Sequence, residues 1–266
     1  MMIQNLLKYL TCLLLLLCCP SLEAADRHDP PGNSIKTIVI DPGHGGKDTG
    51  TGGANVLEKN MVLQIGLKLE KAIKAALPDV KVIMTRRTDV FVELYHRIDI
   101  ANANNADLFI SLHCNSMPRR GNYRSVHGTE TFVSGFHRLG QQDAAIRENA
   151  AMLLEENYEE NYHGFDPNEP ESAIVFSLMK NQYRDQSINF ATLLQDNYTR
   201  SGRYDRGVKE QGLAVLAKAG MPAVLTELGF LSNPSEEQYI RSDAGQKQIV
   251  QNIVNAIKTY KNRMEQ

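Results

Sequence analysis

The alternation of short apolar strands with amphipathic helices is the feature that most constrains the fold of this chain. Residues 37–40 (TIVI) are all β-branched, which predicts a strand buried on both faces. Residues 58–77 follow, with Met61, Ile65 and Leu69 on one face of an expected helix. Because a strand buried on both faces needs covering elements on each side of its sheet, this order predicts an α/β domain.

The same pattern continues towards the C-terminus. We expect further strands at residues 80–84, 108–112, 128–133, 214–216 and 223–228, and helices at residues 91–105, 236–239 and 244–261. Together these elements predict an α/β fold with a mixed, largely parallel sheet that is flanked by helices on both faces.

Residues 139–204 depart from this alternation. Their composition is typical of helix throughout, first at residues 141–158 and again at residues 172–198. The acidic segment between these two helices contains Pro and Gly, which is typical of a loop or a lid. We therefore expect a helical insertion in the domain at about residues 139–204.

The N-terminus has the features of a secretion signal. Lys8 precedes an apolar run at residues 10–19, which is followed by a proline and by the small residues Ala24 and Ala25. The run is too short to span a bilayer comfortably, because a spanning helix needs about 20 apolar residues. We therefore expect residues 1–25 to be a cleaved signal peptide and the mature protein to be periplasmic or secreted.

Cleavage of the expected signal peptide would leave a short linker and one domain. Residues 26–35 are polar and contain Pro and Gly, which predicts a linker, and residues 36–264 then form one large domain. Lipidation at Cys18 or Cys19 is a weaker alternative, because the residue before a lipidated cysteine is normally small and here it is leucine or cysteine. Cleavage would leave Cys114 as the remaining cysteine of four, which excludes an internal disulfide.

Charge and composition argue against a nucleic-acid partner. The chain has 29 Lys and Arg against 31 Asp and Glu, and its sequence contains no basic patch interleaved with aromatic residues. Tryptophan is absent, which disfavours a sugar-binding module built on tryptophan platforms. We expect neither nucleic-acid binding nor a membrane span.

Four ionisable residues lie where expected strands end or helices begin. His44 lies in the segment DPGHGG directly after the first strand, and His113 lies in SLHCNS after another strand. Glu227 lies near the end of an apolar strand, and Glu58 opens the first helix. Because ligand sites in parallel sheets gather beyond the carboxyl ends of the strands, we expect these side chains to lie close together.

These residue types suit metal-assisted hydrolysis. Two imidazoles and a carboxylate, here His44, His113 and Glu58, can hold a Zn²⁺ that keeps one position open for water. The position of Glu58 also suits a first-turn carboxylate that interacts with the helix dipole. Glu227 is the expected proton carrier, because a buried carboxylate near a cation can move a proton from water to a leaving amine. Cys114 is an alternative nucleophile, but strand alternation directs its side chain into the core.

Five segments carry a resemblance to a known family. They are IVIDPGHGG at residues 38–46, LEKN at 57–60, TRRTD at 85–89, SLHCN at 111–115 and TELGFLSN at 226–233. In this order they resemble the zinc-dependent N-acetylmuramoyl-L-alanine amidases of the Amidase_3 type, which are bacterial cell-wall hydrolases with an α/β sandwich fold. The resemblance covers about residues 36–260, so residues 36–264 would be the catalytic domain.

The resemblance has implications for chemistry and control. It implies that His44, Glu58 and His113 bind zinc, that Glu227 is the catalytic glutamate, and that peptidoglycan is cleaved between the lactyl group of N-acetylmuramic acid and L-alanine of the stem peptide. The insertion resembles the regulatory segment of division amidases, in which a helix covers the zinc until an activator partner removes it. An acid of the insertion would then be a fourth ligand, with Glu171 the first candidate; an ordinary solvated acidic lid is the alternative.

Two other functions stay open. A zinc carboxypeptidase acting on wall peptides uses a similar ligand set but needs an arginine for the terminal carboxylate, for which Arg86, Arg97 and Arg206 are candidates. An inactive peptidoglycan-binding regulator would lack at least one of the four site residues, and all four are present.

Overall fold

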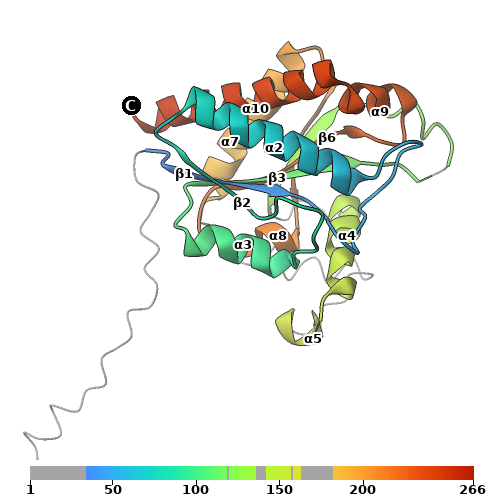
Figure 1. Cartoon of the computed structure of the whole chain (residues 1–266), viewed down its shortest axis with the longest axis horizontal. Helices are drawn as coiled ribbons and strands as arrows, with labels where there is room; N and C mark the ends of the chain where they lie inside the picture. The colour runs from blue at the N-terminus through green and yellow to red at the C-terminus, as the bar shows by residue number, and fades with distance from the viewer. Residues whose placement is uncertain (1–33, 119, 136–141, 157, 163–181) are drawn as a thin grey trace, which may run out of the picture.

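The computed structural model describes residues 34–118, 120–135, 142–156, 158–162 and 182–266. The expected signal peptide and most of the expected linker lie outside these ranges, so both stay predictions. Six strands form a single sheet in the order β2-β1-β3-β6-β4-β5 (Figure 1). The strands are β1 (Thr37–Pro42), β2 (Lys81–Met84), β3 (Leu108–Asn115), β4 (Thr129–Ser134), β5 (Asp205–Gln211) and β6 (Ala223–Phe230).

Helices cover both faces of this sheet (Figure 1). One face carries α2 (Glu58–Ala76), α7 (Arg184–Arg200), α9 (Pro234–Arg241) and α10 (Asp243–Met264). The other face carries α3 (Leu94–Ala103) and α8 (Ala214–Ala217). A further segment, with α4 (Asp143–Asn149), η2 (Ala150–Leu154) and α5 (Tyr158–Asn161), follows β4 in the chain.

The sheet is mixed and largely parallel, as predicted. Every neighbouring pair of strands is parallel except β4 and β6, which are antiparallel. The strands separate two apolar cores: Ile38 and Ile40 of β1 pack towards α2 and α10, and Val39 packs towards α3. This double burial explains why the first strand has no polar alternation.

The parallel pairing of β3 with β6 sets the position of the site. His113 of β3 lies opposite Glu227 of β6, and Glu227 lies opposite Glu130 of β4. β3 continues three residues beyond its predicted end at residue 112, so His113 belongs to the strand itself. Cys114 is 1% exposed and packs in the core, as strand alternation predicts.

One expected strand is wrong and one observed strand was missed. The apolar run at residues 214–216 is part of helix α8, because a run this short cannot be assigned to a strand or a helix from its pattern alone. The strand of this region is β5, whose sequence DRGVKEQ is mostly charged or polar. Its position at the edge of the sheet leaves it half-exposed, and edge strands commonly carry such residues.

The expected insertion contains elements of two different kinds. α7 lies within it but packs against the sheet through the buried Phe190, Leu194 and Tyr198. The segment from α4 to α5 lies mainly against the opposite core. Residues 136–141 and 163–181 are not described, so the boundaries of the insertion stay predictions.

The loop that follows β1 is held by a buried ion pair. Arg97 of α3 is 1% exposed and lies 2.8 Å from Oδ1 of Asp41, which is fully buried. The same guanidinium donates to the carbonyl of His44. Burial alone would raise the pKa of Asp41, but Arg97 and the hydroxyls of Thr85 and Ser111 lower it.

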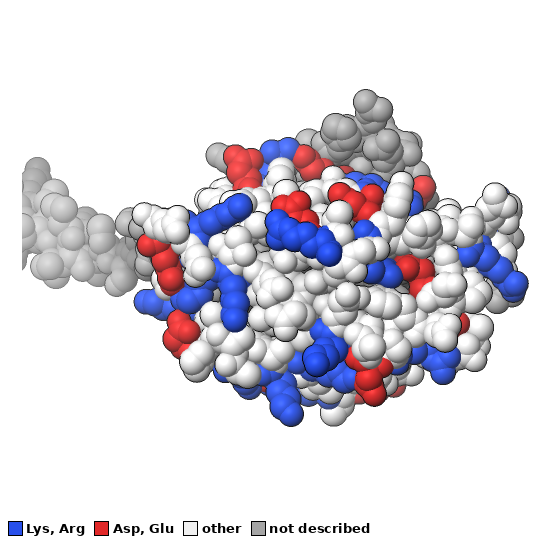
Figure 2. Space-filling model, turned by 90° about the horizontal axis from the view of Figure 1, so that it is seen from above, with Lys and Arg blue, Asp and Glu red and all other residues white. Residues whose placement is uncertain are grey.

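Two surface properties complete the description. None of the described helices combines the length and the apolar character that crossing a bilayer requires. Figure 2 shows the side of the molecule next to α10, where basic and acidic side chains are interspersed among uncharged ones.

Loss of Arg97 should destabilise the fold. Arg97→Leu leaves Asp41 as an unpaired buried charge, which should lower the free energy of unfolding by about 3–5 kcal/mol in urea denaturation. Arg87→Leu is the matched control, because Arg87 is exposed where it pairs with Glu70 and should cost about 1 kcal/mol or less. Equal losses in the two variants would contradict the structural role of Arg97.

Candidate metal centre and active site

The loop after β1 brings His44 to the site with an unusual backbone. His44 has a φ of +59°, in the left-handed region that few non-glycine residues occupy. Gly43 precedes it and lies against the ring of His113, because a Cβ at Gly43 would lie 2.3 Å from Nε2 of that ring. Glycine is therefore needed at residue 43 for the two imidazoles to come together, and their ring centroids are 4.8 Å apart.

Asp48 determines which ring nitrogen of His44 faces the site. Nδ1 of His44 lies 2.8 Å from Oδ2 of Asp48, in the arrangement by which a carboxylate commonly orients a metal-binding histidine. When the proton of the neutral imidazole is on Nδ1, Nε2 has a free lone pair that can coordinate a metal. Burial alone would raise the pKa of Asp48, but the contact with His44 lowers it.

Glu58 lies between the two histidines at the start of α2. Its side chain is 1% exposed, and Oε1 lies 3.1 Å from Nε2 of His44 and 3.3 Å from Nδ1 of His113. Backbone amides orient this carboxylate: Cys114 donates to Oε1 and Thr51 donates to Oε2. The expected role of Glu58 as a first-turn carboxylate is compatible with this position in the cluster.

The geometry of the three side chains fits a divalent metal. Their facing ligand atoms all lie within 4.8 Å of one another. Ligands about 2.0–2.1 Å from a tetrahedral Zn²⁺ are separated by about 3.3 Å, close to the two distances from Glu58. Nε2 of His44 and Nδ1 of His113 are buried and face carboxylate oxygens, but they form no hydrogen bond among the described residues. Coordination of a metal would satisfy both nitrogens and the carboxylates that face them.

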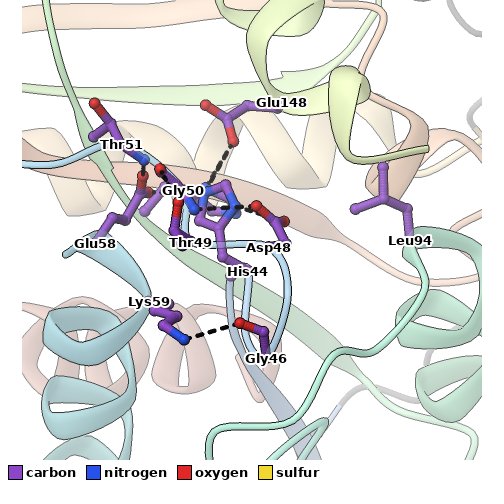
Figure 3. A network of polar contacts seen from close by, with 12 residues as sticks. His44, Gly46, Asp48, Thr49, Gly50, Thr51, Glu58, Lys59, Leu94 and Glu148 are labelled. Carbon is purple, nitrogen blue, oxygen red and sulfur yellow. Dashed lines mark hydrogen bonds and ion pairs between the residues drawn. The ribbon is translucent and has the colours of Figure 1, made fainter. Parts of the chain in front are cut away.

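A second carboxylate, Glu148, enters the cluster from α4 (Figure 3). Its Oε2 lies 2.9 Å from Nδ1 of His113 and 3.4 Å from Nε2 of His44. Burial alone would lower the pKa of His113, but Glu148 and Glu58 raise it to about 10. The two carboxylates favour positive charge at this point, and a divalent cation would provide it.

Glu148 was not predicted. Glu171, the residue predicted as the fourth ligand, lies outside the described residues. A signal for Glu148 was present, however: it lies three and four residues after Ala145 and Ala144, on the helix face that those small residues bury. A charged residue on the buried face of a helix is a candidate for function.

The catalytic candidate Glu227 lies next to this cluster and is fully buried. Burial raises its pKa, and the nearby Glu148 and Glu58 raise it further. Both carboxylate oxygens lack a hydrogen-bond partner among the described residues. Nη2 of Arg147 lies 3.9 Å from Oε1 of Glu227 and donates to Oδ1 of Asn115. Consecutive residues of α4 thus contact Glu227 and the candidate metal-ligand cluster, which is formed by His44, Glu58 and His113.

Comparison with known proteins identifies the family. A family model described as N-acetylmuramoyl-L-alanine amidase matches residues 38–259. The chain belongs to this amidase family. The resemblance drawn from the five sequence segments is therefore confirmed.

Individual relatives agree with this membership. The chain is 29% identical over 226 residues to the N-acetylmuramoyl-L-alanine amidase AmiC of Escherichia coli, a match that covers 84% of the chain and 52% of AmiC. It thus spans about half the length of that amidase. It is 31% identical to the uncharacterized protein YqiI of Bacillus subtilis, over 85% of the chain and 84% of YqiI.

A solved amidase shares the fold. The crystal structure of the N-acetylmuramoyl-L-alanine amidase from Clostridium difficile 630 matches with a TM-score of 0.64 and 28% identity. The match covers 85% of this chain and 97% of the solved chain. The predicted α/β architecture is therefore the architecture of an amidase catalytic domain.

The contact between Asp48 and His44 should strengthen metal binding. Asp48→Ala removes the acceptor that orients the imidazole, so zinc affinity should fall about 10–100-fold in a competition titration with a chromophoric chelator. Asp99→Ala, at an exposed position of α3, is the control and should leave the affinity unchanged. An unaltered zinc affinity in Asp48→Ala would contradict the orienting role.

Proposed function

We propose that the chain is a zinc-dependent N-acetylmuramoyl-L-alanine amidase. It cleaves peptidoglycan at the amide between the lactyl group of N-acetylmuramic acid and L-alanine of the stem peptide. The observation that carries this proposal is the buried meeting of His44, Glu58 and His113 beside Glu227 in a member of the amidase family.

The proposed roles follow from the geometry and the chemistry of each side chain. His44, Glu58 and His113 would hold the ion. A Zn²⁺ at such a site supplies polarisation of a carbonyl and a lowered pKa for a nearby water molecule. Glu227 accepts the proton of the attacking water and delivers it to the departing nitrogen of L-alanine. A raised pKa suits a group that must both accept and return this proton.

We propose further that α4 inhibits the enzyme through two adjacent residues. Glu148 lies against the metal-ligand cluster, where the attacking water would have to lie. Arg147 pairs with the proposed base Glu227. Displacement of α4 would free both groups at once, and an activator protein that binds this segment is the partner we propose.

The alternative functions have weaker support. Arg86 donates to the backbone carbonyls of Pro42, Gly43 and Lys59, and Arg97 pairs with Asp41, so neither is available for a substrate carboxylate. The third candidate, Arg206, lies on β5, two strands away from Glu227 on β6. An inactive binder would not need a complete ligand set with a buried carboxylate beside it. Because peptidoglycan lies outside the cytoplasm, the proposed activity also requires export, which the expected signal peptide would provide.

Removal of the proposed base should abolish turnover without loss of metal. Glu227→Gln should slow release of stem peptides from purified sacculi by about 10²–10⁴-fold, because proton transfer by a positioned group contributes about this much. Zinc content, measured by mass spectrometry of the metal, should be unchanged. Products identify the reaction: free stem peptides support an amidase, whereas released D-alanine or equal activity after removal of zinc with a chelator would contradict the proposal.

Removal of the blocking carboxylate should activate the enzyme. Glu148→Ala should raise basal hydrolysis of sacculi by roughly 10-fold or more, since a charge-assisted contact of about 1.5–3 kcal/mol no longer holds α4 in place. Glu156→Ala is the matched control, because Glu156 is an exposed acid of the same segment. If Glu148→Ala has the same or lower activity than the unsubstituted chain, the inhibitory role of Glu148 is wrong.

A further inference from the structure

A hollow is lined by residues of β4, β5 and α4, among them Arg147, which lies near Glu227. It has a volume of about 560 Å³, within the range of small-ligand sites. Its lining includes the polar side chains Asn115, Glu130, Arg206 and Lys209, together with the rings of Phe132 and Phe230. Such a mixture of rings and a few convergent charged groups can bind a small polar molecule with a fixed orientation.

Two residues of the lining place this hollow close to Glu227. Asn115 lies two positions beyond His113 on β3, and Glu130 lies opposite Glu227 in the pairing of β4 with β6. Nδ2 of Asn115 donates to Oε1 of Glu130, which joins the two strands at this point. A substrate bound at Glu227 would therefore extend into the hollow. Either its stem peptide or its sugar part would lie there.

The acids and cations that line the hollow are equal in number: Glu130, Asp143 and Glu210 against Arg147, Arg206 and Lys209. Glu130 is 4% exposed and pairs with Nζ of Lys209, while Nε of Arg206 lies 3.6 Å from the same carboxylate. One carboxylate thus faces two cations. Glu210, another acid of the lining, is paired with Arg184 of α7. Arg206 and Lys209 therefore share the single carboxylate of Glu130.

Arg206 has hydrogen-bond donors to spare. A guanidinium has five N–H donors. Nε of Arg206 has no hydrogen-bond partner among the described residues, and Nη1 makes a long contact of 3.5 Å with the carbonyl of His127. The guanidinium lies 4.9 Å above the ring of Phe230, which holds its plane in the wall of the hollow. A planar donor group held in this way suits a carboxylate.

Helix α4 contributes the remaining charges of the lining. Asp143 and Arg147 both come from α4, and Arg147 is engaged with Glu227. When α4 is displaced, as proposed above, the exposed acid Asp143 leaves together with the blocking residues. The charges of Asp143 and Arg147 cancel, so the displacement would leave the net charge of the lining unchanged and would open the hollow towards Glu227.

We propose that this hollow binds the stem peptide, and that Arg206, assisted by Lys209, recognises the free carboxylate of the acidic residue that follows L-alanine. This inference rests on the proposed amidase function. β5, which carries both cations, lies two strand spacings from β6 and Glu227, or about 10 Å. Two residues of extended peptide reach about 7 Å, and the arginine side chain spans the remainder.

The test compares two muropeptides that differ in one group. One has a free α-carboxylate on the glutamate after L-alanine, and in the other this carboxylate is amidated. Kinetics are measured for the zinc-loaded chain and for the same chain with Glu148→Ala. We expect kcat/KM to be about 10-fold higher for the carboxylate substrate, mainly through KM, because charge-assisted hydrogen bonds discriminate by about this factor.

Substitutions then assign the preference to Arg206. Arg206→Gln should reduce the preference to about one by raising KM for the carboxylate substrate, while kcat for the amidated substrate changes little. Arg206→Lys should retain part of the preference, and Arg200→Gln, at an exposed position of α7, should retain all of it. Equal rates on both substrates in the unsubstituted chain, or an equal loss on both in Arg206→Gln, would overturn the proposal.

Failure of the carboxylate contact can be distinguished from failure of the proposed amidase activity. Hydrolysis of the amidated substrate reports amidase activity without the carboxylate contact. If no variant cleaves either muropeptide, the amidase proposal fails, and calorimetric titration with the two free stem peptides tests the binding site by itself. Tighter binding of the carboxylate peptide that is lost in Arg206→Gln supports the site, and equal binding of the two peptides contradicts it.

Discussion

The site depends on a buried carboxylate, Glu58, that lies between two imidazoles. Burial alone would raise the pKa of Glu58, but His44 and His113 lower it. An ionised carboxylate in the interior is tolerated only when it is paired and hydrogen-bonded, and here backbone amides of Thr51 and Cys114 complete its environment. The fold supplies these partners from β1, α2 and β3, which meet at one end of the sheet.

The architecture explains why these groups meet there. The parallel strands β1, β3 and β6 end on the same side of the sheet, so His44, His113 and Glu227 arrive at one edge despite their separation in the chain. The buried pair of Asp41 and Arg97 supports the loop that carries His44. The metal-ligand cluster therefore rests on rigid elements, which is what a preorganised site requires.

Much of this arrangement could be predicted from the sequence because its signals are local. The β-branched run of β1 and the apolar stripe of α2 each lie within one segment, and the site residues follow them directly. β5 was missed because an edge strand with charged residues lacks such a signal, and α8 was misassigned because its apolar run is short. Glu148 shares a helix face with Ala144 and Ala145, which is a sequence signal, but its contact with the histidines depends on where α4 packs.

Helix α4 links catalysis, inhibition and substrate binding in this account. Glu148 contacts the metal-ligand cluster, Arg147 contacts Glu227, and Asp143 lines the hollow that we assign to the stem peptide. A single displacement would alter all three, so activation would couple release of the base to opening of the peptide site. This coupling needs one two-state element, α4, and both sites contact it directly.

The most direct test is anomalous diffraction at the zinc edge from crystals of the zinc-loaded protein. The account predicts one zinc ion bound by Nε2 of His44, Nδ1 of His113 and the carboxylates of Glu58 and Glu148, with Glu227 beside the ion but not bound to it. Zinc located away from His44, Glu58 and His113, or bound by them with Glu148 turned away in the unsubstituted protein, would contradict it.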